Sequence, residues 1–242
     1  PAKPAMQDLH RGLFATIDLI EICSDLAQRI QLINLERTRA SREFFEQNVS
    51  QFHANQDLIA SYAQYGQTVT EFLDATSTKK GRVLEVGPGE GAFLLELSRR
   101  FDRVIALDTS KEMLALSQKK IQDQKLANVE LIHGDTRLAL EEELVVDCIT
   151  LNMVLHHAPD PAAILSDLAR LLKKNGVLLI TELCHHDQTW AYESCGDLWL
   201  GFEPNDLSSW ADAAGLDEGE SLYLAQRNGF QIQLRQFFKK TK

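Results

Sequence analysis

The chain has 242 residues, with 35 acidic and 25 basic side chains and a formal net charge of −10 at pH 7. This length accommodates one complete α/β domain with an extension. The acidic balance disfavours direct binding to a nucleic-acid backbone, which requires a cationic surface. Four widely spaced cysteines form no CxxC pair, which is typical of free thiols in a reducing compartment. We therefore expect a cytoplasmic protein without direct nucleic-acid binding.

Helical rather than strand periodicity dominates the first 75 residues. Charged residues interrupt the apolar stretch at 13–33, which therefore predicts neither an export signal nor a membrane-spanning helix. More helix precedes the first strand than an α/β domain requires. We expect residues 1–42 to form a helical arm, for dimerisation or as a connector, and residues 43–242 to form the main domain. The alternative is a helical cap over the ligand pocket.

A glycine-rich turn follows the first predicted strand, 83–86, and leads directly into a helical pattern at 93–101. Strand, glycine turn and helix in this order open a nucleotide-binding βαβ unit, and glycines let a ligand lie close to the backbone. Gly87, Gly89 and Ala92 have the spacing of a dinucleotide fingerprint, whereas Gly87, Gly89 and Gly91 have that of a loop that binds S-adenosylmethionine (SAM). The nearby carboxylate of Glu85 favours SAM, because it would repel a pyrophosphate but suit a sulfonium and an amino group.

An acidic residue also follows the second predicted strand, 104–107. Asp108 lies about 20 residues beyond the glycine turn, where a carboxylate can accept hydrogen bonds from two ribose hydroxyls. We expect Thr109 to open the next helix in a capping box with Glu112. Met113, in the first turn of that helix, is expected beside an adenine ring.

Gly134, Asp135 and Thr136 follow the third predicted strand, 129–133. In open α/β sheets, ligands bind outside the carboxyl ends of the strands. Asp135 could therefore accept a hydrogen bond from the adenine amino group, or it could be an ordinary loop carboxylate.

The fourth predicted strand, 145–151, ends in Asn152 and Met153, and His156 and His157 follow. By the same rule, this end of the strand faces the reacting group of a bound ligand. Imidazole can act as a general base at neutral pH. The alternative is a pair of loop histidines that make structural hydrogen bonds.

A long segment, 184–203, follows the fifth predicted strand, 177–183, and should cover the ligand pocket as a lid. His185 and His186 lie near its start, and the carboxylate of Asp187 could orient the ring of His186. Among all these candidates, we expect the catalytic residues to be His186, His156 and Asn152.

The same segment raises the question of a metal site. Cys184, His185, His186 and Cys195 offer sulfur and nitrogen ligands, but their spacing matches no usual zinc pattern. We therefore expect no metal.

The C-terminal part predicts a helix at 204–214 and then a hairpin, with strands at 221–226 and 230–237 around Asn228-Gly229. A terminal antiparallel hairpin is unusual in dehydrogenases. This feature disfavours the remaining alternative, an NAD-binding oxidoreductase.

These motifs, taken in order over residues 81–242, resemble the class I SAM-dependent methyltransferases. The resemblance implies a doubly wound, mostly parallel, seven-stranded Rossmann-like sheet with a C-terminal antiparallel hairpin. It also implies methyl transfer from SAM to a small or medium-sized acceptor, with S-adenosylhomocysteine (SAH) as product. The implied cofactor-binding residues are Glu85, Gly87, Pro88, Gly89, Gly91, Asp108, Thr109, Met113, Gly134, Asp135, Thr136, Asn152 and Met153.

A narrower resemblance lies in residues 39–45, 197–202 and 206–216, which are similar to the methyltransferase half of fused ArsR-type regulators. Those regulators carry an N-terminal winged helix-turn-helix, of which this chain shows no evident recognition helix. The resemblance leaves a second function open, namely a regulatory module that senses SAM or a metabolite with little or no turnover. The surplus of helix before the first strand separately leads us to expect a homodimer through the N-terminal helices.

Overall fold

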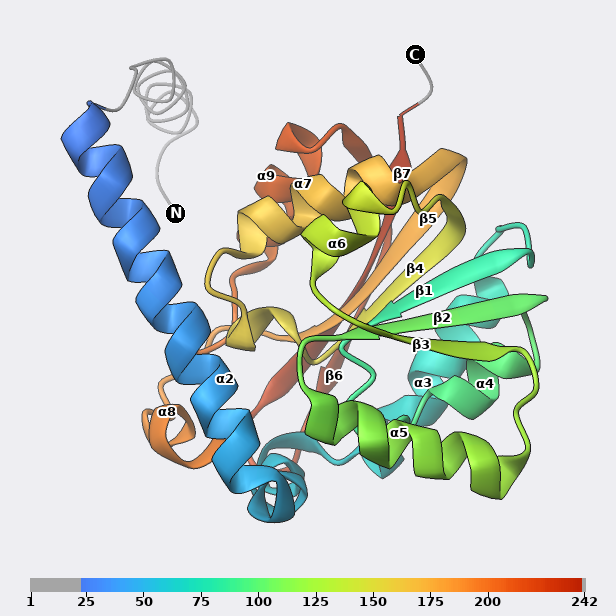
Figure 1. Cartoon of the computed structure of the whole chain (residues 1–242), viewed down its shortest axis with the longest axis horizontal. Coiled ribbons are helices and arrows are strands. Elements are labelled where there is room, and N and C mark those ends of the chain that lie inside the picture. The colour runs from blue at the N-terminus through green and yellow to red at the C-terminus, as the bar shows by residue number, and fades with distance from the viewer. Residues whose placement is uncertain (1–22, 241–242) are drawn as a thin grey trace. The chain divides into compact units, whose positions relative to one another are not determined.

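The computed structural model describes residues 23–240, apart from several side chains between 42 and 54 (Figure 1). The chain divides into two compact units, residues 1–37 and 38–242. Residues 1–22 of the arm expected at 1–42 lie outside the described residues. Within the described part, no helix combines the length and the apolar character that a membrane span requires.

Within the described residues, two helices precede the sheet, as the helical periodicity predicts. α2 (Ser24–Ala60) is one continuous helix of 37 residues, and α3 (Tyr62–Ala75) follows after a break at Ser61. Ser61 starts α3 through a capping box in which the Gln64 side chain accepts a hydrogen bond from the Ser61 N–H at 2.9 Å. The inner face of α3 is apolar and buried at Val69 and Leu73, so this helix packs on the sheet.

The seven strands form one sheet in the order β3-β2-β1-β4-β5-β7-β6. The first five are parallel, and β7 is antiparallel to both β5 and β6. The predicted doubly wound sheet with its terminal antiparallel hairpin is therefore confirmed. The strands are β1 (Arg82–Val86), β2 (Arg103–Asp108), β3 (Val129–His133), β4 (Val146–Asn152), β5 (Leu172–Leu183), β6 (Leu216–Ala225) and β7 (Gln231–Lys239).

Helices cover both faces of this sheet (Figure 1). α4 (Leu94–Ser98) and α5 (Lys111–Gln124) lie with α3 on one face, and α6 (Thr136–Glu141), α7 (Pro161–Leu171) and α9 (Pro204–Ala213) lie on the other. Two separate hydrophobic cores result, because successive residues of a strand point to opposite faces. Burial on both faces explains why the central strands are almost continuously apolar.

Several local expectations are wrong. The first hairpin strand, β6, begins at Leu216 rather than at 221. The N-cap of α5 is Ser110 rather than Thr109, and the Ser110 hydroxyl accepts a hydrogen bond from the Met113 N–H at 3.2 Å. Strand β5 begins at Leu172 rather than at 177, because Leu172 pairs with Val146 before the register shifts. Pairing with β4 thus extends β5 back to the end of α7, into a segment for which the sequence alone predicts the end of a helix.

Candidate cofactor and acceptor site

The residues expected to bind the cofactor lie at the carboxyl ends of four neighbouring strands, β3, β2, β1 and β4, or in the segments that follow them. These strands are parallel, so their carboxyl ends meet at one edge of the sheet. The register places Glu85 opposite Thr150 and Asp108 opposite His133. The tertiary structure therefore brings the loops that carry the predicted residues to one edge.

The glycine turn leaves one side of its backbone open. Gly87 and Gly89 both adopt left-handed backbone angles, with φ of 65° and 54°. A Cβ at Gly87 would lie 2.6 Å from a methyl of Val154, whereas a Cβ at Gly89 would meet nothing within 4 Å. The Ser117 hydroxyl donates to the Gly89 carbonyl at 2.8 Å and holds the turn from the other side. A ligand can therefore approach the backbone at Gly89.

Glu85 is a buried carboxylate, with 2% of its surface exposed. Two donors from β4 hold it: the Thr150 hydroxyl, and the Asn152 side-chain amide at 3.0 Å. Burial raises the pKa of Glu85 to about 8, although both hydrogen bonds lower it. None of the ion pairs among the described residues involves Glu85. The carboxylate is thus desolvated but lacks a cationic partner, which a positively charged ligand would supply.

Asp108 lies against the glycine turn. Its carboxylate accepts a hydrogen bond from the Ser110 N–H at 2.9 Å. Burial raises the pKa of Asp108, and the backbone N–H groups of Ser110, Gly89 and Thr109 oppose that effect. A carboxylate fixed between two loops at the end of β2 suits a ribose diol.

The three residues after β3 differ in their surroundings. Asp135 caps α6, and its Oδ1 accepts from the Arg137 and Leu138 N–H groups, both at 3.1 Å. The buried Thr136 donates its hydroxyl to Asp167 at 2.7 Å. The Thr136 hydroxyl is therefore already engaged between α6 and α7, and a ligand contact would have to come from its backbone.

Two buried methionines belong to the segments at this edge: Met113 in the first turn of α5 and Met153 directly after β4. Met153, directly after β4, has a φ of 57°, which is uncommon for a residue with a side chain. Its N–H donates to the Thr181 carbonyl at 2.8 Å and holds this turn against β5. Such strained positions cluster at functional sites.

His186 accepts a hydrogen bond through one of its two ring nitrogens. Its Nδ1 accepts from the Gln188 N–H at 3.2 Å, so the proton of the neutral ring is on Nε2. Nε2 is buried without a hydrogen-bond partner. Burial lowers the pKa of His186 to about 4, so the ring is neutral at pH 7. Asp187 is fully exposed, and its Oδ1 lies 3.9 Å from His185 Nε2. Asp187 therefore pairs with His185 rather than with His186.

His156 is buried between two carboxylates. Its Nδ1 lies 2.5 Å from Glu182 Oε1, and its Nε2 lies 3.9 Å from Asp197 Oδ1. Burial disfavours the charged ring, but Glu182 and Asp197 together raise the pKa of His156 to about 9. Sequence reasoning singled out neither carboxylate. Glu182 could have been noticed as a charged residue within an apolar strand, but nothing local distinguishes Asp197.

The segment 185–203 is bound to the turn after β4. It contains α8 (Trp190–Cys195), and the turn contains a short 3-10 helix, η1 (Leu155–His157). The Leu198 and Trp199 N–H groups both donate to the His156 carbonyl, at 2.8 and 3.1 Å. This segment, called the covering segment below, is thereby fixed to the end of β4.

The cysteines of this region are buried thiols. Burial raises the pKa of Cys184 to about 11 and that of Cys195 to about 12, so both are protonated at neutral pH and are poor metal ligands in that form. Among the described residues, His156, His157 and Asp197 are the group of three that could hold a metal ion.

Comparison with known proteins places this geometry in context. Residues 84–180 match the family described as "Methyltransferase domain". A demethylmenaquinone methyltransferase from Staphylococcus saprophyticus is 28% identical over 160 residues, which cover 64% of this chain and 67% of that protein. The solved structure of the N-methyltransferase NodS from Bradyrhizobium japonicum, in complex with SAH, has a TM-score of 0.60 and 15% identity, and covers 79% of this chain and 99% of its own. The cyclase SpnF has a TM-score of 0.66 at 14% identity and covers 83% of this chain and 95% of its own.

The matched stretch begins within β1 and ends within β5, so it contains Glu85, Asp108 and Asn152. At these identities the solved structures establish the fold, and the family match adds the kind of domain. The chain has the fold of the class I methyltransferases, and the family match and its relatives support a methyltransferase.

Proposed function

We propose that this chain is a SAM-dependent methyltransferase that acts on a small or medium-sized acceptor and releases SAH. The observation that carries the proposal is the buried Glu85 carboxylate, which has no ion-pair partner among the described residues and lies beside a glycine turn that is open at Gly89. SAM carries two positive charges, on its sulfonium and its amino group, and pairing with one of them would offset the desolvation of Glu85.

The remaining cofactor contacts follow from the same edge of the sheet. In the proposed complex, Asp108 accepts hydrogen bonds from the ribose hydroxyls, and the backbone at Gly87 and Gly89 lies against the cofactor. Asp135 Oδ2 accepts from the adenine amino group while Oδ1 continues to cap α6. The proposed adenine neighbours are Met113, Thr109, Gly134 and Thr136, and Met153 is proposed to line the methionine end with Asn152.

Methyl transfer to a nucleophile is an in-line displacement, and the sulfonium already carries the leaving group. The protein therefore contributes mainly orientation and the exclusion of water. Asn152 is proposed to act through Glu85, because its amide holds that carboxylate. His156 is proposed as a positioning residue, because both of its ring nitrogens face buried carboxylates.

For His186, the hydrogen bond from Gln188 changes the role that fits best. A base would have to use the Nδ1 lone pair, which already accepts that hydrogen bond. The neutral ring can instead donate from Nε2 to an acceptor group of the methylated molecule. We propose this donor role for His186 in place of proton removal.

The comparisons do not support the alternative function, that of a sensor module related to ArsR-type regulators. Turnover separates the two functions, since both would bind SAM. The decisive assay is release of SAH from SAM during incubation with candidate acceptors. The name of the Staphylococcus relative suggests demethylmenaquinone as one of the first acceptors to test.

Cofactor identity is tested first by thermal unfolding with SAM, SAH or NADH in excess. A ligand that binds the folded state raises the melting temperature. We expect SAM and SAH to raise it and NADH to leave it unchanged. A shift with NADH alone would overturn the assignment of Glu85 and indicate an oxidoreductase.

A further inference from the structure

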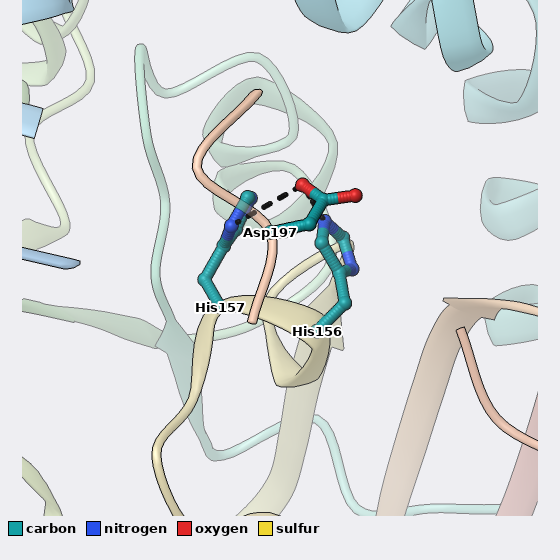
Figure 2. A group of neighbouring side chains, drawn as sticks. All are labelled: His156, His157 and Asp197. Atoms are coloured by element: carbon teal, nitrogen blue, oxygen red, sulfur yellow. Dashed lines mark ion pairs between the residues drawn. The ribbon is translucent and has the colours of Figure 1, made fainter. Parts of the chain in front are cut away.

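Three buried side chains converge at the junction between the covering segment and η1. Figure 2 shows the Asp197 carboxylate between the rings of His156 and His157. Asp197 Oδ1 lies 3.9 Å from His156 Nε2 and 3.6 Å from His157 Nδ1. One donor atom from each residue lies within 4.8 Å of the other two. Two imidazoles and a carboxylate are the ligand types that catalytic zinc sites use.

Asp197 is poorly satisfied by the protein itself. Only 3% of its surface is exposed, and neither carboxylate oxygen has a hydrogen-bond partner among the described residues. Buried carboxylates in folded proteins are normally paired, hydrogen-bonded or bound to a metal, because desolvation is costly. The 3.9 and 3.6 Å separations are too long for hydrogen bonds. A further cationic group at this position would satisfy both oxygens of Asp197.

The charge of the cluster leads to the same conclusion. Glu182 and Asp197 are both buried, and His156 supplies at most one positive charge between them. One imidazolium therefore leaves one buried negative charge. A divalent cation with two neutral imidazoles would balance both carboxylates.

Glu182 is placed as an outer partner of such a site. Its Oε1 lies 2.5 Å from His156 Nδ1. A neutral His156 would donate Nδ1–H to Glu182 and direct the Nε2 lone pair toward Asp197. A carboxylate behind a ligating histidine is the common arrangement in zinc proteins, where it fixes the tautomer and the ring orientation. Glu182 is itself held by the Leu183 N–H at 2.7 Å.

The dimensions require the three side chains to draw together. Zinc–nitrogen and zinc–oxygen bonds of about 2.1 Å place tetrahedral ligand atoms roughly 3.4 Å apart. The separations of 3.6 and 3.9 Å exceed that spacing, and all three donor atoms lie within 4.8 Å of one another. His157 Nδ1 also donates to the Gly196 carbonyl at 3.3 Å, and this hydrogen bond would have to open for Nδ1 to bind a metal. Three protein ligands leave the fourth position for a water molecule or another group.

We propose that His156, His157 and Asp197 bind one divalent transition-metal ion of the zinc type, with Glu182 as the outer partner of His156. This ion would fasten the covering segment to η1, and so to the end of β4. The proposal replaces our expectation from sequence that the chain binds no metal, which considered only the cysteine-containing set. It does not depend on methyl transfer, so it can fail or succeed separately from the proposed function.

The test uses the full chain, stripped with a chelator and then titrated with Co²⁺, a spectroscopic substitute for Zn²⁺. We expect one equivalent to bind, with visible absorption bands of tetrahedral intensity, and Zn²⁺ to displace it. Asp197→Asn should reduce the affinity at least tenfold. Glu182→Gln should reduce it about 10–100-fold, the usual effect of removing a carboxylate that holds a ligating histidine. Asp187→Asn, which alters a fully exposed carboxylate of the same covering segment, is the matched control and should bind like wild type.

Circular dichroism of each variant identifies a loss of folding. If Asp197→Asn does not fold, His157→Gln serves in its place with the same expected loss. Absence of a stoichiometric site in the wild-type chain would overturn the proposal, as would equal binding by wild type and a folded Asp197→Asn. Thermal shifts with SAM, measured on the same stripped protein, report separately on the proposed cofactor.

Discussion

Thr150 lies opposite Glu85 across the β1–β4 pair, and its hydroxyl donates a hydrogen bond to the Glu85 carboxylate. The two residues are 65 positions apart in the sequence. With Asn152, Thr150 fixes both oxygens of a carboxylate that has no ion-pair partner among the described residues. A cationic ligand would supply the charge partner that this carboxylate lacks.

Glu85→Gln should weaken SAM binding by roughly 10–100-fold, because a hydrogen bond to a charged group contributes about 1.5–3 kcal/mol. Isothermal titration calorimetry gives the affinity directly. Glu90→Gln is the matched control, since Glu90 lies in the same glycine turn. Equal losses in both variants would indicate a general disturbance of the turn instead of a specific role for Glu85.

SAM affinity should depend on pH through Glu85. The pKa of the free protein's Glu85 is about 8, above its ordinary value of 4.5, and pairing with a cationic ligand lowers it. Below pH 8 a proton must leave before the pair forms, so affinity should fall about tenfold per pH unit as the pH decreases and level off above pH 8. Titrations from pH 6 to 9 check this slope, and Glu85→Gln should abolish it.

The raised pKa of Glu85 makes the stability of the free protein fall as the pH rises, whereas SAM affinity should rise. A folded-state pKa above the unfolded value means that the folded chain holds the proton more tightly. The contribution of Glu85 to stability is therefore full below about pH 4.5 and is lost as the pH rises toward 8. Denaturant midpoints of wild type minus those of Glu85→Gln should decrease across this range. A flat difference would mean that Glu85 is ionised in the free protein.

Asp108→Asn should weaken SAM binding at least tenfold, because the ribose hydroxyls lose a charged acceptor. The control is Asp123→Asn, on the exposed side of α5. Both affinities follow from the same calorimetric titration. Unchanged affinity in Asp108→Asn would remove Asp108 from the proposed site.

Gly89→Val should abolish SAM binding while the chain still folds. The new side chain would point into the open space beside the turn, where no protein atom lies within 4 Å, and so occupy the place of the ligand. The left-handed backbone costs about 1–2 kcal/mol for a residue with a side chain. Gly215→Val carries the same strain, with φ of 79° and equally open surroundings, and should keep its affinity. Retained binding by Gly89→Val would show that the turn is only structural.

The N-terminal helices are proposed to hold a homodimer together. Leu26, Ile30 and Ile33 are spaced along one side of α2 and are 41–49% exposed, which is unusual for large apolar side chains in such an arrangement. Ile30→Glu combined with Ile33→Glu should convert a dimer to a monomer in light scattering. Gln28→Glu, on the same helix, should leave the dimer intact. A monomeric wild-type chain would contradict the proposal.

The amino-acid sequence by itself determined the βαβ opening, the order of the seven strands along the chain and the terminal hairpin, but not the short helices α6 and α8. The sequence was enough to recognise the glycine turn, Asp108 after the second strand and the Asn228-Gly229 hairpin. Turn chemistry and apolar periodicity are set within a few neighbouring residues. Such patterns have the same meaning wherever the segment lies in the fold. They were wrong where neighbours compete locally, as at Thr109 and Ser110 for the start of α5.

Only the tertiary structure decided which side chains meet. Glu85 gains Thr150 through strand order and register, and His156 gains Glu182 from the next strand. Asp197 reaches the two histidines because backbone hydrogen bonds fasten the covering segment to η1. These contacts join residues 26 to 65 positions apart, or bring together loops with no periodic signal. Spacing along the chain cannot encode them, because the distance between two side chains depends on how every intervening element packs.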